Sequence, residues 1–336
     1  MSSIIETAKA IGTRGKGILA ADESTGTIAK RFSDISLEST EDNRRAYREM
    51  LFTANGIKEY LSGVILFEET LMQKSSSGKL LADILTELNI IPGIKVDKGL
   101  VNLPFTDHEK ITQGLDGLAE RLEEYKKYGA KFAKWRAVFN ISDIKPTQLA
   151  IEANAHALAR YAAICQSAGI APIVEPEILM DGNHTIARCK AVTEQVLQTV
   201  FAQLHLHKVK LEGIILKPSM VTTGQSASQQ ADIEQVAKDT IEVLLRTVPA
   251  AVPTINFLSG GQSAELATAH LNMMNKLYPN LPWTLSFSYG RALQAPCLDA
   301  WHGQAENVEK AQTILHKRCK LNGLAVTGDY ASEMEA

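Results

Sequence analysis

The sequence predicts one α/β domain over residues 1–336, built as a (β/α)8 barrel of the TIM-barrel class. Three observations lead to this fold class. Short apolar runs rich in β-branched residues recur along the chain, and a longer segment of helical period follows each of them. Eight such strand–helix units occur, which is the number that closes a parallel barrel. No linker rich in Pro, Gly or Ser divides the 336 residues, so a length that also fits two domains is assigned to one barrel.

The elements of this barrel are read from the same periodicity, after a short helical pattern over Met1–Gly12. The expected strands are Gly17–Glu23, Val64–Thr70, Pro92–Asp97, Phe132–Phe139, Pro172–Glu177, Gly213–Lys217, Pro253–Gly260 and Trp283–Gly290. The expected helices are Glu41–Ala54, Leu80–Leu88, Leu115–Tyr128, Ile151–Ala168, Thr185–Leu206, Ile233–Arg246, Gln262–Lys276 and Asn307–Asn322. Strands that alternate with helices favour a parallel sheet with helical crossovers. The alternative is an open sheet, in which two of the runs are buried helix segments.

The charge balance and the cysteine usage limit the class of protein. Thirty-five Lys and Arg against 38 Asp and Glu give a formal net charge of −3, so no overall basic surface favours nucleic acid. No apolar stretch is long enough to cross a membrane, and the N-terminus lacks the pattern of a signal peptide. The cysteines are far apart and predict free thiols, at Cys165, Cys189, Cys297 and Cys319. We expect a cytoplasmic protein without nucleic-acid or membrane partners.

Charged residues stand at the C-terminal ends of five expected strands, where a barrel core would otherwise be apolar. In three of these runs two charges lie two residues apart, which puts both on the same face of the strand. Such a pair fits best facing inward near the barrel mouth, where active sites of this fold class lie. The converging residues would be Asp22, Lys95, Asp97, Lys134, Arg136, Glu175, Glu177 and Lys217. For any one of them alone, a solvated strand end or a structural ion pair is the alternative.

Lys217 has the sequence context of a nucleophilic amine, because it ends an apolar run and is expected at the end of a buried strand. Burial and the cationic neighbours Lys134 and Arg136 favour the neutral amine, which is the form that attacks a carbonyl carbon. Glu175 and Glu177, on the preceding strand, are close enough to act as general acid and base. This group predicts Schiff-base chemistry on a ketone. For Lys217 alone, an ion pair at the barrel mouth is the alternative.

Glycine-rich ends of the last two expected strands predict a phosphate site. Its residues are Ser259, Gly260, Gly261, Ser288, Gly290 and Arg291. Glycine lets backbone N–H groups approach an anion, and the loops after the seventh and eighth strands are the usual phosphate site of this fold class. Arg291 would add a bidentate contact. Glycines that serve only tight turns are the alternative.

A second anion site is indicated after the first expected strand. There a hydroxyl-rich turn with Ser24 and Thr27 opens a helix that carries Arg31, and Lys95 would reach it from the third strand. A capped surface helix explains the same pattern equally well. Two phosphate sites that flank a Schiff-base lysine imply a substrate with a phosphate at each end.

No motif for a metal or a nucleotide is found in the sequence. Gly12–Gly17 lacks the spacing of a P-loop and precedes a strand instead of following one. His205 and His207 close an amphipathic helix without a third ligand, and the other histidines are scattered. We therefore expect neither a metal nor a cofactor.

Motifs that follow one another in order cover nearly the whole chain. They are GKGILAADESTGTIAKR (15–31), NRRAYREMLFTA (43–54), GVILFEETL (63–71), GIKVDKG (93–99), TQGLDGL (112–118), FAKWRAV (132–138), ARYAAICQ (159–166), PIVEPEIL (172–179), LKPSMV (216–221), FLSGGQS (257–263) and SFSYGRALQ (286–294). In these motifs the sequence resembles a class I fructose-bisphosphate aldolase. The resemblance implies reversible, metal-independent cleavage of fructose 1,6-bisphosphate to dihydroxyacetone phosphate and glyceraldehyde 3-phosphate.

Roles for single residues follow from the same resemblance, carried over by position. It implies that Lys217 forms the Schiff base and that Glu175 is the principal acid and base. Glu177 and Lys134 would assist dehydration, and Asp22 would act on the C4 hydroxyl. The residues at the C1 phosphate would be Ser259, Gly260, Gly261, Ser288, Gly290 and Arg291. Those at the C6 phosphate would be Ser24, Thr27, Arg31 and Lys95, with Arg136 also binding substrate. The resemblance further implies a homo-oligomer, specifically a homotetramer.

The chain departs from the animal members of that family at three places. Those members have a mobile C-terminal tail that ends in a tyrosine and helps to protonate the enamine, whereas the nearest tyrosine here is Tyr330. Ser219 stands where the animal pattern has Asn, and Ile57 lies near the position of an Arg. We expect Tyr330 or a bound water to replace the tail tyrosine. The alternatives are a Schiff-base lyase or transaldolase for other sugar phosphates, and an inactive barrel that serves as a binding protein.

Overall fold

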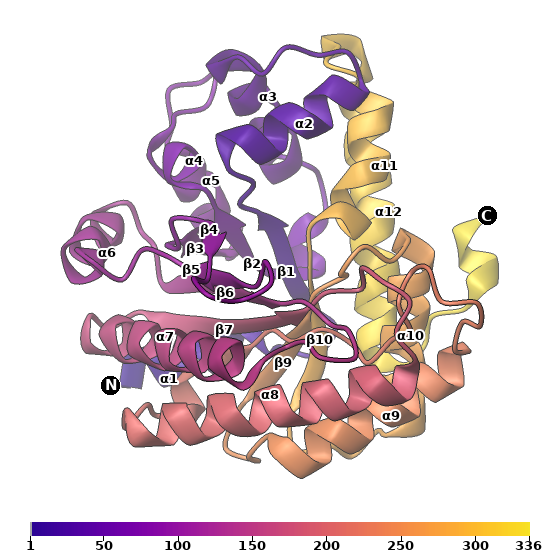
Figure 1. The fold of residues 1–336 in the computed structure, drawn as a ribbon. Coiled ribbons are helices and arrows are strands. Elements are labelled where there is room, and N and C mark those ends of the chain that lie inside the picture. The colour runs from indigo at the N-terminus through magenta and orange to yellow at the C-terminus, as the bar shows by residue number, and fades with distance from the viewer. Residues whose placement is uncertain (1) are drawn as a thin grey trace.

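The computed structural model describes residues 2–336, and within them eight parallel strands close into one barrel (Figure 1). The barrel strands are β1 Gly17–Ala21, β2 Leu61–Leu66, β3 Ile91–Lys95, β6 Phe132–Phe139, β7 Ala171–Ile178, β8 Ile215–Leu216, β9 Thr254–Phe257 and β10 Thr284–Tyr289. Around the barrel they follow the order β1-β10-β9-β8-β7-β6-β3-β2, and β1 pairs with both β2 and β10. The predicted (β/α)8 fold is confirmed, because an open sheet would leave two unpaired edges.

Helices connect the strands and form the outer layer of the barrel (Figure 1). They are α1 Ser2–Ile11, α2 Thr25–Asp34, α3 Glu41–Phe52, α4 Glu68–Met72, α5 Leu81–Glu87, α6 Leu118–Lys127, α7 Gln148–Ser167, α8 Ile186–Leu206, α9 Ile233–Thr247, α10 Ala264–Leu277, α11 Arg291–Trp301 and α12 Val308–Thr327. Side-chain oxygens cap the starts of α2, α3, α7, α8, α9 and α10, as they do at helix N-termini generally. Every helix expected from the periodicity overlaps one of these.

The barrel interior is apolar at its N-terminal end. Ile18, Ile65, Phe132, Ile173 and Ile215 form one buried cluster there, and α1 contributes Ile4, Ala8 and Ile11 to it. The strands are buried on both faces because helices cover the outside, as in other parallel sheets. With α1 closing one end of the barrel, the C-terminal end is left for polar groups.

The second expected strand is displaced from its predicted position. Val64–Thr70 was expected to be extended, but β2 begins at Leu61 and ends at Leu66. Residues 68–72 form the short helix α4, with Glu68 and Glu69 in its first turn, where acidic side chains are favourable. The sixth expected strand is shortened to β8, because Leu211–Gly213 forms a 3-10 turn before it.

The sequence also did not predict one hairpin and the helix α11. A small antiparallel hairpin, β4 Leu100–Asn102 with β5 Lys110–Thr112, lies between β3 and α6. Its strands are three residues long, too short for a periodic pattern. Helix α11 follows β10 directly and contains Pro296, a residue that usually marks a helix boundary.

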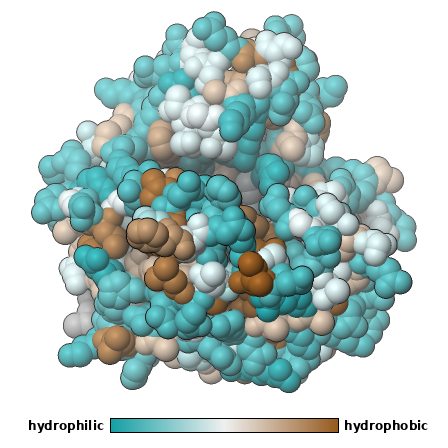
Figure 2. Space-filling model, viewed as in Figure 1, coloured by the Kyte–Doolittle hydropathy of each residue, from teal (hydrophilic) through white to brown (hydrophobic). Residues whose placement is uncertain are grey.

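The molecular surface seen in Figure 2 is largely hydrophilic, with apolar residues in small separate groups. Among the exposed large apolar side chains are Phe105, in the β4–β5 hairpin, and Ile144. Within residues 2–336, no helix has both the length and the apolar character needed to span a membrane.

Candidate active site

A cavity of about 220 Å³ opens at the C-terminal ends of the barrel strands. Of the sixteen predicted catalytic and substrate-binding residues, all but Gly261 line this cavity. The fifteen are Asp22, Ser24, Thr27, Arg31, Lys95, Lys134, Arg136, Glu175, Glu177, Lys217, Ser259, Gly260, Ser288, Gly290 and Arg291. Gly261 follows Gly260 in the same turn, and a Cβ at Gly261 would lie 3.5 Å from Nη2 of Arg291. The structure therefore brings together residues from strand ends that are far apart in the sequence.

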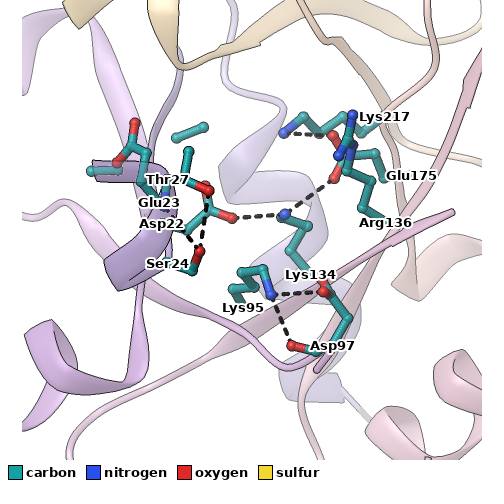
Figure 3. A network of polar contacts seen from close by, with 12 residues as sticks. Asp22, Glu23, Ser24, Thr27, Lys95, Asp97, Lys134, Arg136, Glu175 and Lys217 are labelled. Atoms are coloured by element: carbon teal, nitrogen blue, oxygen red, sulfur yellow. Dashed lines mark hydrogen bonds and ion pairs between the residues drawn. The ribbon is translucent and has the colours of Figure 1, made fainter. Parts of the chain in front are cut away.

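Lys217 lies directly after β8, and its backbone N–H donates to the carbonyl oxygen of Val174 at 2.8 Å, which continues the barrel register. Lys217 is 4% exposed, and its Nζ lies 3.0 Å from Oε1 of Glu175, which faces the cavity from β7 (Figure 3). The group nearest to the amine is thus a carboxylate, whereas the sequence pattern had pointed to cationic neighbours. A carboxylate at this distance can accept a proton from the amine and return it later.

Lys134 joins two of the buried carboxylates. Its Nζ lies 2.7 Å from Oδ2 of Asp22 and 3.5 Å from Oε2 of Glu175 (Figure 3). Burial alone would lower the pKa of Lys134, but the charges of Asp22 and Glu175 outweigh it and raise that pKa above its usual value. Burial likewise would raise the pKa of Asp22, yet Lys134 and Lys217 hold it well below the usual range. At neutral pH, Lys134 is an ammonium and Asp22 a carboxylate.

Two further ion pairs border the same cavity. Arg136 on β6 pairs with Glu177 on β7, and this outweighs burial and raises the pKa of Arg136. Lys95, at the end of β3, donates to the carboxylate of Asp97 at 2.6 Å and to its carbonyl oxygen at 2.8 Å (Figure 3). Asp97 itself does not line the cavity, so it contacts the Lys95 side chain from outside the cavity.

The predicted phosphate loops lie side by side on the ends of β9 and β10. Gly260 and Gly261 have φ values of 59° and 93°, a region that glycine enters without strain. Gly290 is the N-cap of α11 and Arg291 its first residue, so the positive end of a helix dipole faces this part of the cavity. The hydroxyl of Ser288 is buried and has no hydrogen-bond partner among residues 2–336. These features suit an anion.

The second predicted anion site lies at the start of α2. Ser24 is the N-cap of this helix, and its Oγ accepts from the backbone N–H of Thr27 at 3.4 Å and lies 3.1 Å from the Thr27 hydroxyl. The guanidinium of Arg31, one of the last residues of α2, is paired with Glu23. Since these residues line the cavity together with Lys95, the turn is more than a cap on a surface helix.

A buried hydrogen-bond network around Glu23, the ion-pair partner of Arg31, was not predicted from the sequence. Glu23 lies 2.8 Å from Nη2 of Arg48, and its Oε1 also accepts from the side-chain amide of Gln294 at 2.9 Å. The same amide donates to the carbonyl oxygen of Ala20 at 2.6 Å. Glu23 stands beside Asp22 at the end of the first expected strand, which was the available signal. Arg48 and Gln294 lie within helices, where no pattern distinguishes them.

None of the residues that mark the departures, Ser219, Ile57 and Tyr330, lines the cavity. Ser219 is buried, and its hydroxyl donates to the carbonyl oxygen of Ile178 at 3.0 Å and accepts from the N–H of the same residue at 2.9 Å. It thus ties the end of β7 to the segment after β8. Tyr330 is 8% exposed and does not line the cavity, and its hydroxyl lies 3.1 Å from Glu335. Among the described residues, no cluster of three His, Cys, Asp or Glu forms a metal site.

Comparison with known proteins gives a consistent result over the whole chain. Residues 3–336 match a family model described as "Fructose-bisphosphate aldolase class-I". The chain is 55% identical over 332 residues to "Fructose-bisphosphate aldolase 4, cytosolic" of Arabidopsis thaliana, covering 99% of this chain and 84% of that protein. It is 57% identical over 333 residues to "Fructose-bisphosphate aldolase" of Dictyostelium discoideum, covering 98% and 93%.

A solved structure agrees with these relatives. The fructose-bisphosphate aldolase of Plasmodium falciparum, determined in a ternary complex with TRAP and a small-molecule inhibitor, superposes with a TM-score of 0.97. It is 53% identical, and the match covers 98% of this chain and 96% of that one. The family model, the sequence relatives and the solved structure all indicate the same family. The chain belongs to the class I fructose-bisphosphate aldolase family.

Proposed function

We propose that Lys217 is the Schiff-base lysine through which this class I aldolase reversibly cleaves fructose 1,6-bisphosphate to dihydroxyacetone phosphate and glyceraldehyde 3-phosphate. The observation that carries the proposal is the 3.0 Å contact between Nζ of Lys217 and Oε1 of Glu175 inside the cavity. Among the lysines that line it, Lys95 and Lys134 are each bound to an aspartate at 2.6–2.7 Å. Within residues 2–336, Lys217 forms its ion pair with Glu175 alone, and this carboxylate can accept the proton of the amine.

The first half of the reaction forms the covalent adduct. Glu175 accepts a proton from the Lys217 ammonium, and the free amine attacks C2 of the ketose to give a carbinolamine. The protonated Glu175 then delivers this proton to the C2 hydroxyl, which leaves as water while the iminium forms. Lys134 and the Arg136–Glu177 pair surround this step with fixed charges. The proton taken at the start thus leaves with the water.

The second half breaks the carbon–carbon bond. Asp22 takes the proton of the C4 hydroxyl, the C3–C4 bond breaks, and its electron pair moves into the iminium to give an enamine. Glyceraldehyde 3-phosphate then leaves, C3 is protonated, and water hydrolyses the adduct to release dihydroxyacetone phosphate. Asp22 is available for this role because Lys134 keeps its carboxylate ionised.

The two anion sites would hold one substrate phosphate each. We assign the C1 phosphate to the loops after β9 and β10, namely to Ser259, Gly260, Gly261, Ser288, Gly290 and Arg291. We assign the C6 phosphate to the α2 side of the cavity, namely to Ser24, Thr27, Arg31 and Lys95, with Arg136 also contacting the substrate. A substrate that extends between the two sites would have its C2 ketone beside Lys217.

Reductive trapping tests the nucleophile. Borohydride added with dihydroxyacetone phosphate should attach the substrate irreversibly to the peptide that carries Lys217, as read by mass spectrometry, and Lys217→Met should abolish the label. The iminium is the electron sink of the proposed reaction, so EDTA should leave cleavage activity unchanged. A label on another lysine, or loss of activity with EDTA, would contradict the assignment.

We also propose that the protein acts on sugar phosphates as a homotetramer in the cytoplasm. The location agrees with the names of relatives from Arabidopsis thaliana and Pisum sativum, which are called cytosolic or cytoplasmic. Exposed apolar side chains such as Phe105 and Ile144 are compatible with burial between subunits. Light scattering coupled to size-exclusion chromatography should give four times the mass of the chain, and a monomer at micromolar concentration would contradict the assembly.

A further inference from the structure

The glycine turn after β9 is held by a buried side-chain contact from α10. In the turn, the N–H of Gln262 donates to the carbonyl oxygen of Ser259 at 3.0 Å, and the two central residues, Gly260 and Gly261, both have positive φ. This is the geometry of a type I′ turn. Glycine has no side chain that could fix such a turn, so its shape depends on the residues at its two ends.

Gln262 supplies that fixation through its amide group. Its Nε2 donates to Sδ of Met220, in the segment after β8, at 3.6 Å. Its Oε1 lies 2.6 Å from Nδ1 of His270 on α10. An amide oxygen only accepts hydrogen bonds, so Nδ1 of His270 carries the proton. The amide is thereby attached both to the segment after β8 and to helix α10.

The environment of the His270 ring favours the hydrogen bond to Gln262 and no other. His270 is 3% exposed, and its Nε2 has no hydrogen-bond partner within residues 2–336. A protonated ring would leave a buried N–H without an acceptor, and burial accordingly lowers the pKa of His270 to about 4. At neutral pH the ring is therefore uncharged and held in one tautomer.

We propose that His270 is a positioning residue for substrate phosphate: its Nδ1–H holds Gln262 and so fixes the Ser259–Gln262 turn in its phosphate-binding shape. The inference rests on the proposed function, in which this turn binds the C1 phosphate. His270 does not line the cavity, so it acts through Gln262 and touches no substrate. Without its partner, Oε1 of Gln262 would be buried and unsatisfied, which favours a shift of the turn toward water.

The expected consequence concerns binding more than chemistry. The C1 phosphate is bound in the ground state and in the transition state alike, so weaker phosphate binding raises KM while kcat is nearly unchanged. Inorganic phosphate, which would compete for the same turn, should also bind more weakly. A loss of folded protein would instead lower the active fraction without changing KM, so the KM-against-kcat split separates the two explanations.

Two substitutions at His270 separate the hydrogen bond from the packing. His270→Phe keeps the ring volume but removes the donor, and should raise both KM for fructose 1,6-bisphosphate and the inhibition constant of inorganic phosphate roughly tenfold. His270→Asn loses ring volume but keeps an N–H donor close to the position of Nδ1, and should stay within about twofold of the parent in both constants. Unchanged constants in His270→Phe, or equal damage in both variants, would overturn the inference.

Further variants keep the test decisive. His316→Phe is a matched control, since His316 packs edge-on against Tyr60 at the N-terminal end of β2, and it should change neither constant. If His270→Phe does not fold, Gln262→Met removes the acceptor instead and should give the same rise, whereas unchanged constants would refute the role. Borohydride trapping at Lys217 in the same variants shows whether the Schiff-base function holds, so failure of the two proposals can be told apart.

Discussion

At the scale of single residues, the site is organised around Lys134. It contacts Asp22 at 2.7 Å and Glu175 at 3.5 Å, while Lys217 contacts the other oxygen of Glu175 at 3.0 Å. Two buried carboxylates are therefore matched by two buried ammonium groups. Each charge would be costly alone in the barrel interior, and the alternation of signs offsets the loss of hydration. The same alternation leaves the carboxyl groups of Asp22 and Glu175 both in contact with Lys134.

Removing the central cation should therefore impair catalysis strongly. We expect Lys134→Met to lower kcat for fructose 1,6-bisphosphate cleavage by a factor of about 100 or more, because it removes a fixed charge from both proton-transfer steps. The coupled-enzyme rate of triose phosphate formation measures this. Lys9→Met, at an exposed position on α1, is the matched control and should match the parent. A kcat within tenfold of the parent in Lys134→Met would refute the role.

The ion pair also predicts a pH dependence of stability. Lys134 and Lys217 outweigh burial and lower the pKa of folded Asp22 below its ordinary value of 3.8, so its ionised form stabilises the native state at neutral pH. That contribution is complete above the unfolded pKa and is lost as the pH falls through the lower folded pKa. We expect the difference in unfolding free energy between the parent and Asp22→Asn to be constant from about pH 7 to 5 and to shrink below about pH 4. Urea titrations would measure it, and a difference that grows on acidification would contradict the sign.

At the scale of elements, glycines on two neighbouring strands make room for one aromatic ring. Phe132 at the start of β6 fills the barrel interior, and a Cβ at Gly93 on β3 would lie 2.2 Å from the ring. A Cβ at Gly63 on β2 would lie 3.0 Å from the same ring and 2.6 Å from Cδ1 of Ile11 on α1. These contacts explain the glycines inside the strands, a position that otherwise weakens a sheet.

Gly93→Ala should consequently destabilise the barrel. Its methyl group overlaps the Phe132 ring, and overpacking of this kind costs about 1–3 kcal/mol of unfolding free energy. Phe132→Leu should relieve the overlap, so that the double variant loses less stability than the sum of the two single changes. Gly26→Ala is the control, because a Cβ there meets nothing within 4 Å and alanine favours the helix. Additive losses in chemical denaturation would contradict this packing.

At the scale of the whole molecule, the last residues pack against the outer helices. Arg318 on α12 is buried and forms hydrogen bonds to Glu335 at 2.6 and 2.7 Å, and to Thr268 on α10 at 2.7 Å. The backbone N–H of Tyr330 donates to Asn272 on α10 at 3.0 Å. Burial raises the pKa of Tyr330 to about 12, so its phenol stays neutral. In this position the Tyr330 hydroxyl contacts Glu335 and lies outside the cavity.

We expect Tyr330→Phe to leave the reaction intact. The phenol hydroxyl contacts Glu335 and does not line the cavity, so cleavage and enamine protonation should stay within about twofold of the parent. Tritium exchange at C3 of dihydroxyacetone phosphate measures the protonation step directly. A selective loss of exchange, with Schiff-base formation unaffected, would show that Tyr330 reaches the enamine in a conformation different from this one.

Much of the barrel could be read from the chain because its strands are short apolar runs with clear ends. The least accurate assignment was Val64–Thr70, where α4 begins directly after β2 and no polar turn separates the two elements. The β4–β5 hairpin was not predicted because three residues per strand are too few to show an alternating pattern. Helix α11 was not predicted because it contains Pro296, and proline usually marks a helix boundary.

By itself, the sequence determined the eight strand–helix units, the charges at the strand ends and, by resemblance, the aldolase chemistry. These are properties of residue type and order, which periodicity and motifs record. Only the tertiary structure decided that Glu175 faces Lys217, that Lys134 bridges Glu175 and Asp22, and that His270 contacts Gln262 in the turn after β9. Such contacts join residues that are up to about 110 positions apart, and they exist only because barrel closure brings parallel strand ends to one mouth.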